Sequence, residues 1–109
     1  MTVSDLLKTG KFKEIVVTDG TREIVGVYIG DLLSWVMGRA EADNAWITIM
    51  SNVNVIAVAT LVDVSCVILA EGVTLDENIA STAHDKGINV ISSELSIYDI
   101  AKLLAGILV

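Results

Sequence analysis

The sequence predicts a single α/β domain, spanning residues 1–109, with a mostly parallel sheet and helices packed on its faces. Three observations lead to this fold class. The segment from Ala45 to Thr74 has the pattern of a strand, a helix and a second strand. The same alternation continues toward the C-terminus, and a length of 109 residues is typical of one domain. A strand-helix-strand unit favours two parallel strands joined by a right-handed crossover.

The central unit is defined by two apolar runs and the helix between them. Ala45–Met50 is short and suited to a strand, and Ser51-Asn52 then supplies the hydroxyl and amide groups that cap helices. Val53–Leu61 is apolar nearly all round, which predicts a helix buried on more than one side. Val64–Ala70 is the second strand, and Glu71–Thr74 follows it as a loop.

Before this unit, the sequence predicts one short helix and two strands. They span Val3–Lys8, Glu14–Thr18 and Glu23–Tyr28. Thr2 is the expected cap of the helix and Gly10 its end. Asp19-Gly20 is a strong turn signal, and the run after it can pair with a neighbouring strand. Gly26 within that run indicates a bulge or a close backbone approach.

A helix over Asp31–Met37 is predicted next. Its apolar residues share one face, namely Leu32, Leu33, Val36 and Met37. Asp31 is expected in the first turn, where a carboxylate suits the helix dipole, and Gly38 is expected to end the helix.

The C-terminal part predicts a helix, a strand and a last helix. Thr74 and Glu77 have capping-box spacing, and Lys86-Gly87 is a typical helix end. Ile88–Ile91 is a short apolar strand. Ser96, with Asp99 three residues later, is expected to cap the last helix.

The composition predicts an interface with another protein chain. Hydrophobic residues make up 53% of the chain, charged residues only 19%, and proline is absent. A monomer of this size would struggle to bury so much apolar material, so we expect a homodimer or a protein partner. Trp35 and Trp46 stand beside apolar residues and are expected to pack in the core or at that interface.

Charge and patterning argue against nucleic acid and membranes as partners. The net charge of −7 disfavours phosphate backbones, which are bound by clustered Lys and Arg. Residues 45–62 carry no charge, but polar side chains interrupt them and no basic cluster flanks them, so no membrane span is predicted. The single cysteine, Cys66, and the absence of a leader-like N-terminus indicate the cytoplasm.

Ligands of open α/β sheets gather at the carboxyl ends of strands, which directs attention to two loops. The candidate ligand-binding residues there are Ser51, Asn52, Asn54, Glu71, Gly72 and Thr74. Hydroxyl and amide groups beside a helix N-terminus suit a phosphate or carboxylate. The competing explanation is that these residues only cap a helix and allow a tight turn.

The sequence contains no signature of an enzyme. It has no P-loop, no GxGxxG fingerprint, no GxSxG elbow and no metal-ligand spacing, and no cofactor or metal is expected. His84 is the only histidine and is expected near the surface. Cys66 is expected to be a buried, inert thiol.

Three segments resemble the DRTGG domain family, and the likeness extends over roughly the whole chain after Gly20. They are ITIMSNVNVIAVA (47–59), VILAEGVTLDE (67–77) and HDKGINVISSELSIYDIAKLL (84–104). DRTGG domains are small α/β modules, found alone or joined to CBS domains in pyrophosphatases and to phosphate acyltransferases. They are similar to the N-terminal domain of the HPr kinase/phosphorylase family. The resemblance therefore implies a regulatory, ligand-sensing or oligomerising module.

The naming motif of the family is degenerate in this chain. Ser51-Asn52 stands where the family has Asp-Arg, and Ala70-Glu71-Gly72 stands where it has Thr-Gly-Gly. The favoured hypothesis is a non-catalytic regulatory or scaffolding module that homodimerises and serves a larger enzyme or signalling system. The alternative is a sensor of a nucleotide or other small anion at the two loops. A small enzyme with Glu71 or His84 as a base is the weakest hypothesis, because no catalytic constellation accompanies them.

Overall fold

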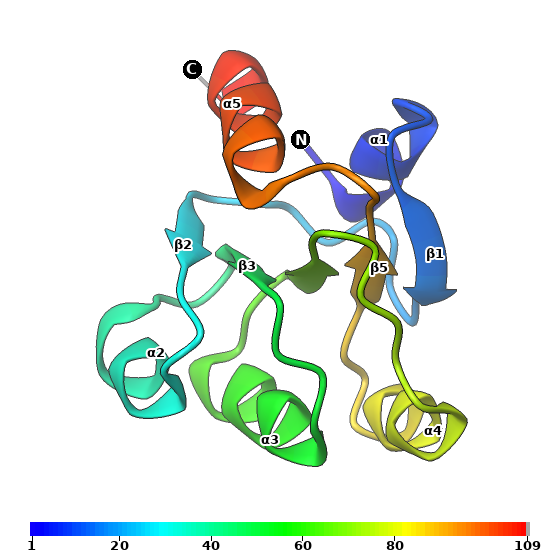
Figure 1. Cartoon of the computed structure of the whole chain (residues 1–109), viewed down its shortest axis with the longest axis vertical. Coiled ribbons are helices and arrows are strands. Elements are labelled where there is room, and N and C mark those ends of the chain that lie inside the picture. Colours follow the sequence, from blue (N-terminus) through cyan, green and yellow to red (C-terminus); the bar gives the residue numbers. More distant parts are fainter. Residues whose placement is uncertain (109) are drawn as a thin grey trace.

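Five strands form one sheet in the order β1-β5-β4-β3-β2 in the computed structural model, which describes residues 1–108 (Figure 1). The strands are β1 (Lys13–Val16), β2 (Val27–Ile29), β3 (Ala45–Thr48), β4 (Cys66–Leu69) and β5 (Val90–Ser92). Strands β2 to β5 run parallel, whereas β1 pairs antiparallel with β5. The predicted α/β fold with a mostly parallel sheet is confirmed.

Five helices cover the two faces of the sheet. They are α1 (Val3–Lys8), α2 (Leu33–Arg39), α3 (Val53–Val62), α4 (Glu77–Asp85) and α5 (Ile97–Leu108). Helices α1 and α5 lie on one face, and α2, α3 and α4 line up on the other (Figure 1). The sheet therefore separates two apolar cores.

Side-chain alternation along β3 and β4 builds both cores at once, because successive residues of a strand point to opposite faces. Trp46 and Val67 pack with the α2–α4 layer, whereas Ile47 and Ile68 pack with α1 and α5. All four residues are fully buried. Trp46 also satisfies its polar group, since its Nε1 donates a hydrogen bond to the carbonyl oxygen of Gly30 at 2.9 Å.

Several predicted helix ends are confirmed. Thr2 forms a complete capping box with Asp5, and the Asn52 side chain accepts a hydrogen bond from the backbone N–H of Asn54. The Ser96 hydroxyl accepts from the N–H of Asp99 at 3.1 Å. These caps come from side chains that were recognisable by residue type alone.

The predicted ends of α2 are wrong on both sides. Asp31 precedes the helix, and its carboxylate accepts hydrogen bonds from the Thr48 hydroxyl at 2.7 Å and from the N–H of Ile49 at 3.0 Å. Asp31 thus ties the start of α2 to the end of β3. Gly38 lies inside the helix, which continues to Arg39 and is closed by the N–H of Ala40.

Two further boundaries differ from the prediction. Helix α4 is capped by Asp76, whose carboxylate accepts from the N–H of Asn78, so Thr74 lies outside the helix and forms no capping box with Glu77. Strand β2 begins only at Val27, because Gly26 has a left-handed backbone with φ of +84° and redirects the chain.

Helix α3 is less enclosed than its composition predicts. Its inner residues are buried, but Val53 is 51% exposed and Leu61 is 70% exposed, with Ala57 exposed between them. These three residues form the α3 stripe, which no other element of the described chain covers. Trp35 on the neighbouring α2 is also 52% exposed, and the Arg39 guanidinium lies 3.7 Å from its ring centroid.

Buried polar residues stand directly before three of the parallel strands. Asn44 precedes β3, Ser65 precedes β4 and Asn89 precedes β5, and each is at most 8% exposed. Asn44 donates to the carbonyl oxygen of Val25 at 2.8 Å. Ser65 donates to the carbonyl oxygen of Asp43 at 2.9 Å. We call this end of the sheet the amino edge; its loops are fixed by side-chain hydrogen bonds from inside the protein.

Arg22 completes the amino edge from the outside. Its Nη2 lies 2.9 Å from Oδ1 of both Asp43 and Asp63, and it donates to the carbonyl oxygen of Asp63. Burial lowers the pKa of Arg22, but the hydrogen bonds to the two carboxylates outweigh burial and raise it. Both aspartates have left-handed backbones, with φ of 66° and 68°. One cation therefore fixes two strained connections.

Candidate functional site

The two predicted site loops lie at the same edge of the sheet, which we call the carboxyl edge. Strands β3 and β4 are adjacent and parallel, and Thr48 is in register with Leu69. The N–H of Ala70 donates to the carbonyl oxygen of Thr48 at 3.1 Å, directly before the chain leaves the sheet. The predicted proximity of the two strand ends is confirmed.

The loop from β3 to α3 is organised as a helix cap. The Asn52 side-chain oxygen accepts from the N–H of Asn54 at 2.9 Å, so this oxygen is engaged in the cap. Asn54 is exposed and Ser51 is partly buried. The Thr48 hydroxyl accepts from the N–H of Met50 and thereby supports the start of the loop.

The loop from β4 to α4 uses its backbone to dock on a neighbouring loop. Glu71 and Gly72 both have left-handed backbones, with φ of 62° and 72°. The N–H of Glu71 donates to the carbonyl oxygen of Leu95, and that of Gly72 donates to the carbonyl oxygen of Ser93, both at 2.9 Å. These two N–H groups are therefore occupied by the β5–α5 loop.

A hollow of about 310 Å³ opens beside this loop, on the side away from β3. It is lined by Lys13, Glu14, Ile15, Gly72, Val73, Thr74, Leu75, Ser92 and Glu94. Two of the predicted site residues, Gly72 and Thr74, thus share a hollow. The other four, Ser51, Asn52, Asn54 and Glu71, do not line it.

Lys13 is a residue of this hollow that sequence reasoning missed. Its strand, β1, runs antiparallel to β5 with Lys13 in register with Ser92, so the start of β1 lies at the carboxyl edge. The sequence shows three lysines close together near the N-terminus, but it carries no signal for the direction of β1. Lys13 thereby brings an ammonium group beside Gly72 and Thr74, in a chain of net charge −7.

Glu94 limits the space in the hollow. A Cβ added at Gly72 would lie 2.5 Å from Oε2 of Glu94, so the glycine is needed for this close approach as well as for its left-handed backbone. Ser93, which is 5% exposed, donates to the carbonyl oxygen of Lys11 at 2.9 Å and accepts from the N–H of Leu95 at 3.1 Å. Ser93 therefore holds the Lys11 segment against the β5–α5 loop.

The reactive residue types are placed away from this hollow. Cys66 is fully buried, and burial raises the pKa of its thiol to about 12. His84 is exposed on α4, with its Nδ1 3.8 Å from Oδ1 of Asp85. Among residues 1–108, no group of three or more His, Cys, Asp or Glu side chains is arranged to hold a metal ion. None of the helices described here has the length and apolar character to cross a membrane.

The fold is shared with a known regulatory region. The chain matches the crystal structure of the CBS and DRTGG domains of the regulatory region of a Clostridium perfringens pyrophosphatase, complexed with the activator diadenosine tetraphosphate. The TM-score is 0.75 at 15% sequence identity, and the match covers 94% of this chain but 45% of that one. The chain thus spans less than half the length of that region. No protein-family model matches the chain, and neither does any curated protein sequence.

Proposed function

We propose that this protein is a non-catalytic regulatory or scaffolding module of the DRTGG type, which homodimerises through α3 and serves a larger enzyme or signalling system in the cytoplasm. Three features support the proposal: the fold is shared with a regulatory region, three segments resemble DRTGG domains, and Cys66 is a single buried thiol. The observation that carries the dimer is the uncovered α3 stripe.

The α3 stripe has the geometry of a self-complementary surface. Val53, Ala57 and Leu61 are spaced four residues apart, so they lie along one face of the helix. A two-fold axis through Ala57 would set Val53 of each copy against Leu61 of the other, with the small alanines at the crossing point. An isologous contact of this kind uses the same residues on both copies.

The surroundings of the stripe also suit a second copy. Helix α3 contains no charged residue, so two acidic protomers can approach each other there without repulsion between like charges on the two helices. A groove of about 390 Å³ runs beside the stripe, lined by Val53, Ile56, Ala57, Thr60, Leu61, Thr82 and Lys86. The groove offers space for the protruding side chains of the partner.

Light scattering after size exclusion tests the dimer. At tens of micromolar, the wild-type protein should elute at twice the protomer mass. Ala57→Glu should yield monomers, because it places two carboxylates at the crossing point. Loss of a central contact that contributes about 2 kcal/mol to association raises the dissociation constant of a dimer roughly thirtyfold. Tyr98→Lys is the matched control, since Tyr98 is 72% exposed on α5. A monomeric wild type, or a dimeric Ala57→Glu variant, would contradict the proposal.

A second candidate function is favoured by Lys13. We infer that the hollow at the carboxyl edge binds a small anion such as a nucleotide phosphate, with Lys13 as the cation and the Thr74 hydroxyl as a donor, on the side of the hollow away from the carboxylates of Glu14 and Glu94 that also line it. The similar pyrophosphatase region was crystallised with a nucleotide activator, which supports this ligand class. Ser51, Asn52, Asn54 and Glu71 remain candidates at the same edge.

Thermal unfolding with a nucleotide panel tests the second candidate. A ligand that binds only the folded state raises the melting temperature, by an amount set by its concentration relative to the dissociation constant. ATP or a dinucleoside polyphosphate at millimolar concentration should raise the melting temperature. Lys13→Gln should abolish the rise, whereas Lys8→Gln on α1 should preserve it. The absence of a shift for every nucleotide would reject this candidate and leave the dimer proposal standing.

A further inference from the structure

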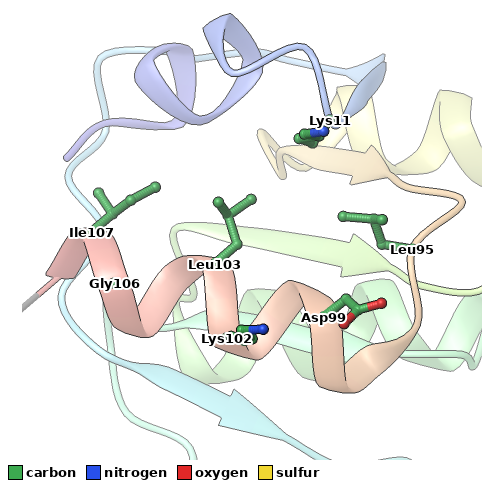
Figure 2. A pocket seen from close by; sticks show the side chains of 7 residues that line it. All are labelled: Lys11, Leu95, Asp99, Lys102, Leu103, Gly106 and Ile107. Carbon is green, nitrogen blue, oxygen red and sulfur yellow. The ribbon is translucent and has the colours of Figure 1, made fainter.

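A second, larger cavity lies between α5 and the segment that joins α1 to β1. Its volume is about 480 Å³, and Figure 2 shows the side chains that line it. They are Lys11, Leu95, Asp99, Lys102, Leu103, Gly106 and Ile107. None of the residues that the sequence pointed to as a site is among them, and neither is any residue of the α3 stripe. We call it the α5 cavity.

The α5 cavity is apolar because α5 carries more apolar surface than the sheet covers. Ile100 and Leu104 are fully buried against the sheet. Leu103 and Ile107 lie beside them and rise from α5 toward the segment that carries Lys11, with Leu95 closing one end (Figure 2). Ile107 is still 40% exposed. A volume of this size falls within the range of pockets for small molecules, roughly 300–1,000 Å³.

Gly106 keeps one wall of the α5 cavity open. It lies in the last turn of α5 without a left-handed backbone, so it does not serve as a helix-ending glycine. Apart from its chain neighbours and the backbone of α5 itself, no heavy atom lies within 4 Å of the position that a Cβ would occupy there. Glycine weakens a helix relative to alanine, and packing within the protomer does not require it at this position.

Two lysines give the α5 cavity a preference for anions. Lys11 and Lys102 line it with one carboxylate, Asp99, so its lining is net positive in a chain of net charge −7. Within residues 1–108, neither lysine has a carboxylate oxygen within 4.0 Å. Both ammonium groups are therefore available to a ligand.

We propose that the α5 cavity binds a small amphipathic anion, meaning a ligand with an aliphatic or aromatic body and a single carboxylate or phosphate head. The body packs on Leu95, Leu103 and Ile107, and the head pairs with Lys11 and Lys102. Because Gly106 has no side chain, the body of the ligand can lie against the backbone of α5 at that position. This site is independent of the dimer surface and of the hollow beside Thr74.

Titration of the ¹⁵N-labelled full chain with three eight-carbon probes tests the proposal. Octanoate and octyl phosphate carry the two kinds of head, and 1-octanol has the same chain without charge. At least one anion should shift the amide resonances of Leu103, Gly106 and Ile107 saturably, with a dissociation constant at least tenfold below that of octanol. The tighter anion identifies the head group. Equal binding of all three probes, or no saturable shift, overturns the proposal.

Substitutions separate ligand binding from folding. Gly106→Ala should preserve or raise the melting temperature. It should nevertheless lower the affinity for the preferred anion at least fivefold, because the added methyl group narrows the α5 cavity. Lys11→Gln with Lys102→Gln should bring anion affinity down to that of octanol, whereas Lys8→Gln, an exposed residue of α1, should leave it unchanged. Unchanged affinity in either cavity variant overturns the proposal. Hydrogen exchange of the free protein at two concentrations provides the last check. Protection of the α5 amides that disappears on dilution would assign this surface to a second copy and overturn the proposal.

Discussion

Both edges of the sheet contain side-chain anchors, which at the carboxyl edge include the Asp31–Thr48 hydrogen bond and Ser93, but the edges differ at the β4–α4 loop. At the amino edge, Asn44, Ser65 and Asn89 are buried and bond to the backbone of the loops, and Arg22 joins two aspartates from outside. At the carboxyl edge, the β4–α4 loop is held by backbone hydrogen bonds to the β5–α5 loop. The hollow beside Thr74 also opens there.

This difference favours the carboxyl edge as the place of the proposed anion site. Side chains that hold loops from inside are not free to meet a ligand. The β4–α4 loop, which is held by its backbone, leaves the Thr74 side chain facing solvent, and Lys13 at the start of β1 faces solvent beside it. The amino edge should therefore respond to substitution by unfolding, and the carboxyl edge by losing ligand or changing local strain.

The largest expected effect is at Asn89. Its side chain donates to the carbonyl oxygens of Asp19 and Ser65 and accepts from the N–H groups of Thr18 and Asp19. Asn89→Ala should lower the free energy of unfolding by about 3 kcal/mol, because each buried group left without a partner costs roughly 1–3 kcal/mol. Urea unfolding followed by circular dichroism measures this loss. A change as small as that of Lys13→Ala, expected within about 0.5 kcal/mol, would erase the contrast between the edges.

A smaller loss is expected at Arg22. Arg22→Met retains the aliphatic stem but removes the hydrogen bonds that hold Asp43 and Asp63. Hydrogen bonds to charged groups contribute about 1.5–3 kcal/mol and exposed ion pairs about 0–1, so we expect a loss of about 1–2 kcal/mol. The same urea experiment measures it, and Lys8→Met serves as the control on the surface of α1. Equal stability of both variants would show that the two connections hold without the cation.

At the carboxyl edge, a side chain at position 72 should introduce strain that removal of the Glu94 side chain partly relieves. Gly72→Ala should cost about 1–2 kcal/mol from the left-handed backbone and the approach to Glu94. In a Glu94→Ala background the cost should be smaller, because the carboxylate no longer blocks the added methyl group. A double-mutant cycle measured by thermal unfolding checks this, and strictly additive effects would place the strain in the backbone alone.

The smallest effect is expected from acid. Hydrogen bonds from the Thr21 hydroxyl and N–H hold the pKa of the Asp19 carboxyl below its ordinary value of 3.8. As the pH falls, this carboxylate therefore takes up a proton in the unfolded state before it does so in the folded state. The stabilisation that the Asp19 hydrogen bonds contribute is present above pH 3.8 and is lost as the pH falls through the pKa of the folded state. Asp19→Asn should reduce the acid-induced fall in melting temperature, measured by thermal unfolding at successively lower pH. An unchanged acid profile would mean that these hydrogen bonds persist in the unfolded chain.

The fold was predictable from sequence because its main signals are local. The apolar runs of β3 and β4 and the caps at Thr2, Asn52 and Ser96 each depend on neighbouring residues. The direction of β1 depends on its pairing with β5, more than seventy positions along the chain, and no local pattern encodes it. The role of Asp31 likewise depends on contact with Thr48 across the sheet.

The candidate site was predictable only in part for the same reason. Gly72 and Thr74 were found because they follow a strand, which is a local feature. Lys13 was missed because it reaches the carboxyl edge through an antiparallel pairing. The exposure of one face of α3 could not be predicted either. An apolar helix that its own chain covers and an apolar helix with one uncovered face have the same composition.

The three buried polar residues at the amino edge have a consequence for how far the sequence of the opposite edge can change. Asn44, Ser65 and Asn89 fix where β3, β4 and β5 start, so these starts do not depend on the exposed side chains at the far end of the sheet. Exposed side chains there, such as Asn54 and Thr74, can therefore be replaced without moving the strands. New tip sequences that keep Thr48, Gly72 and Ser93 should fold without any redesign of the interior.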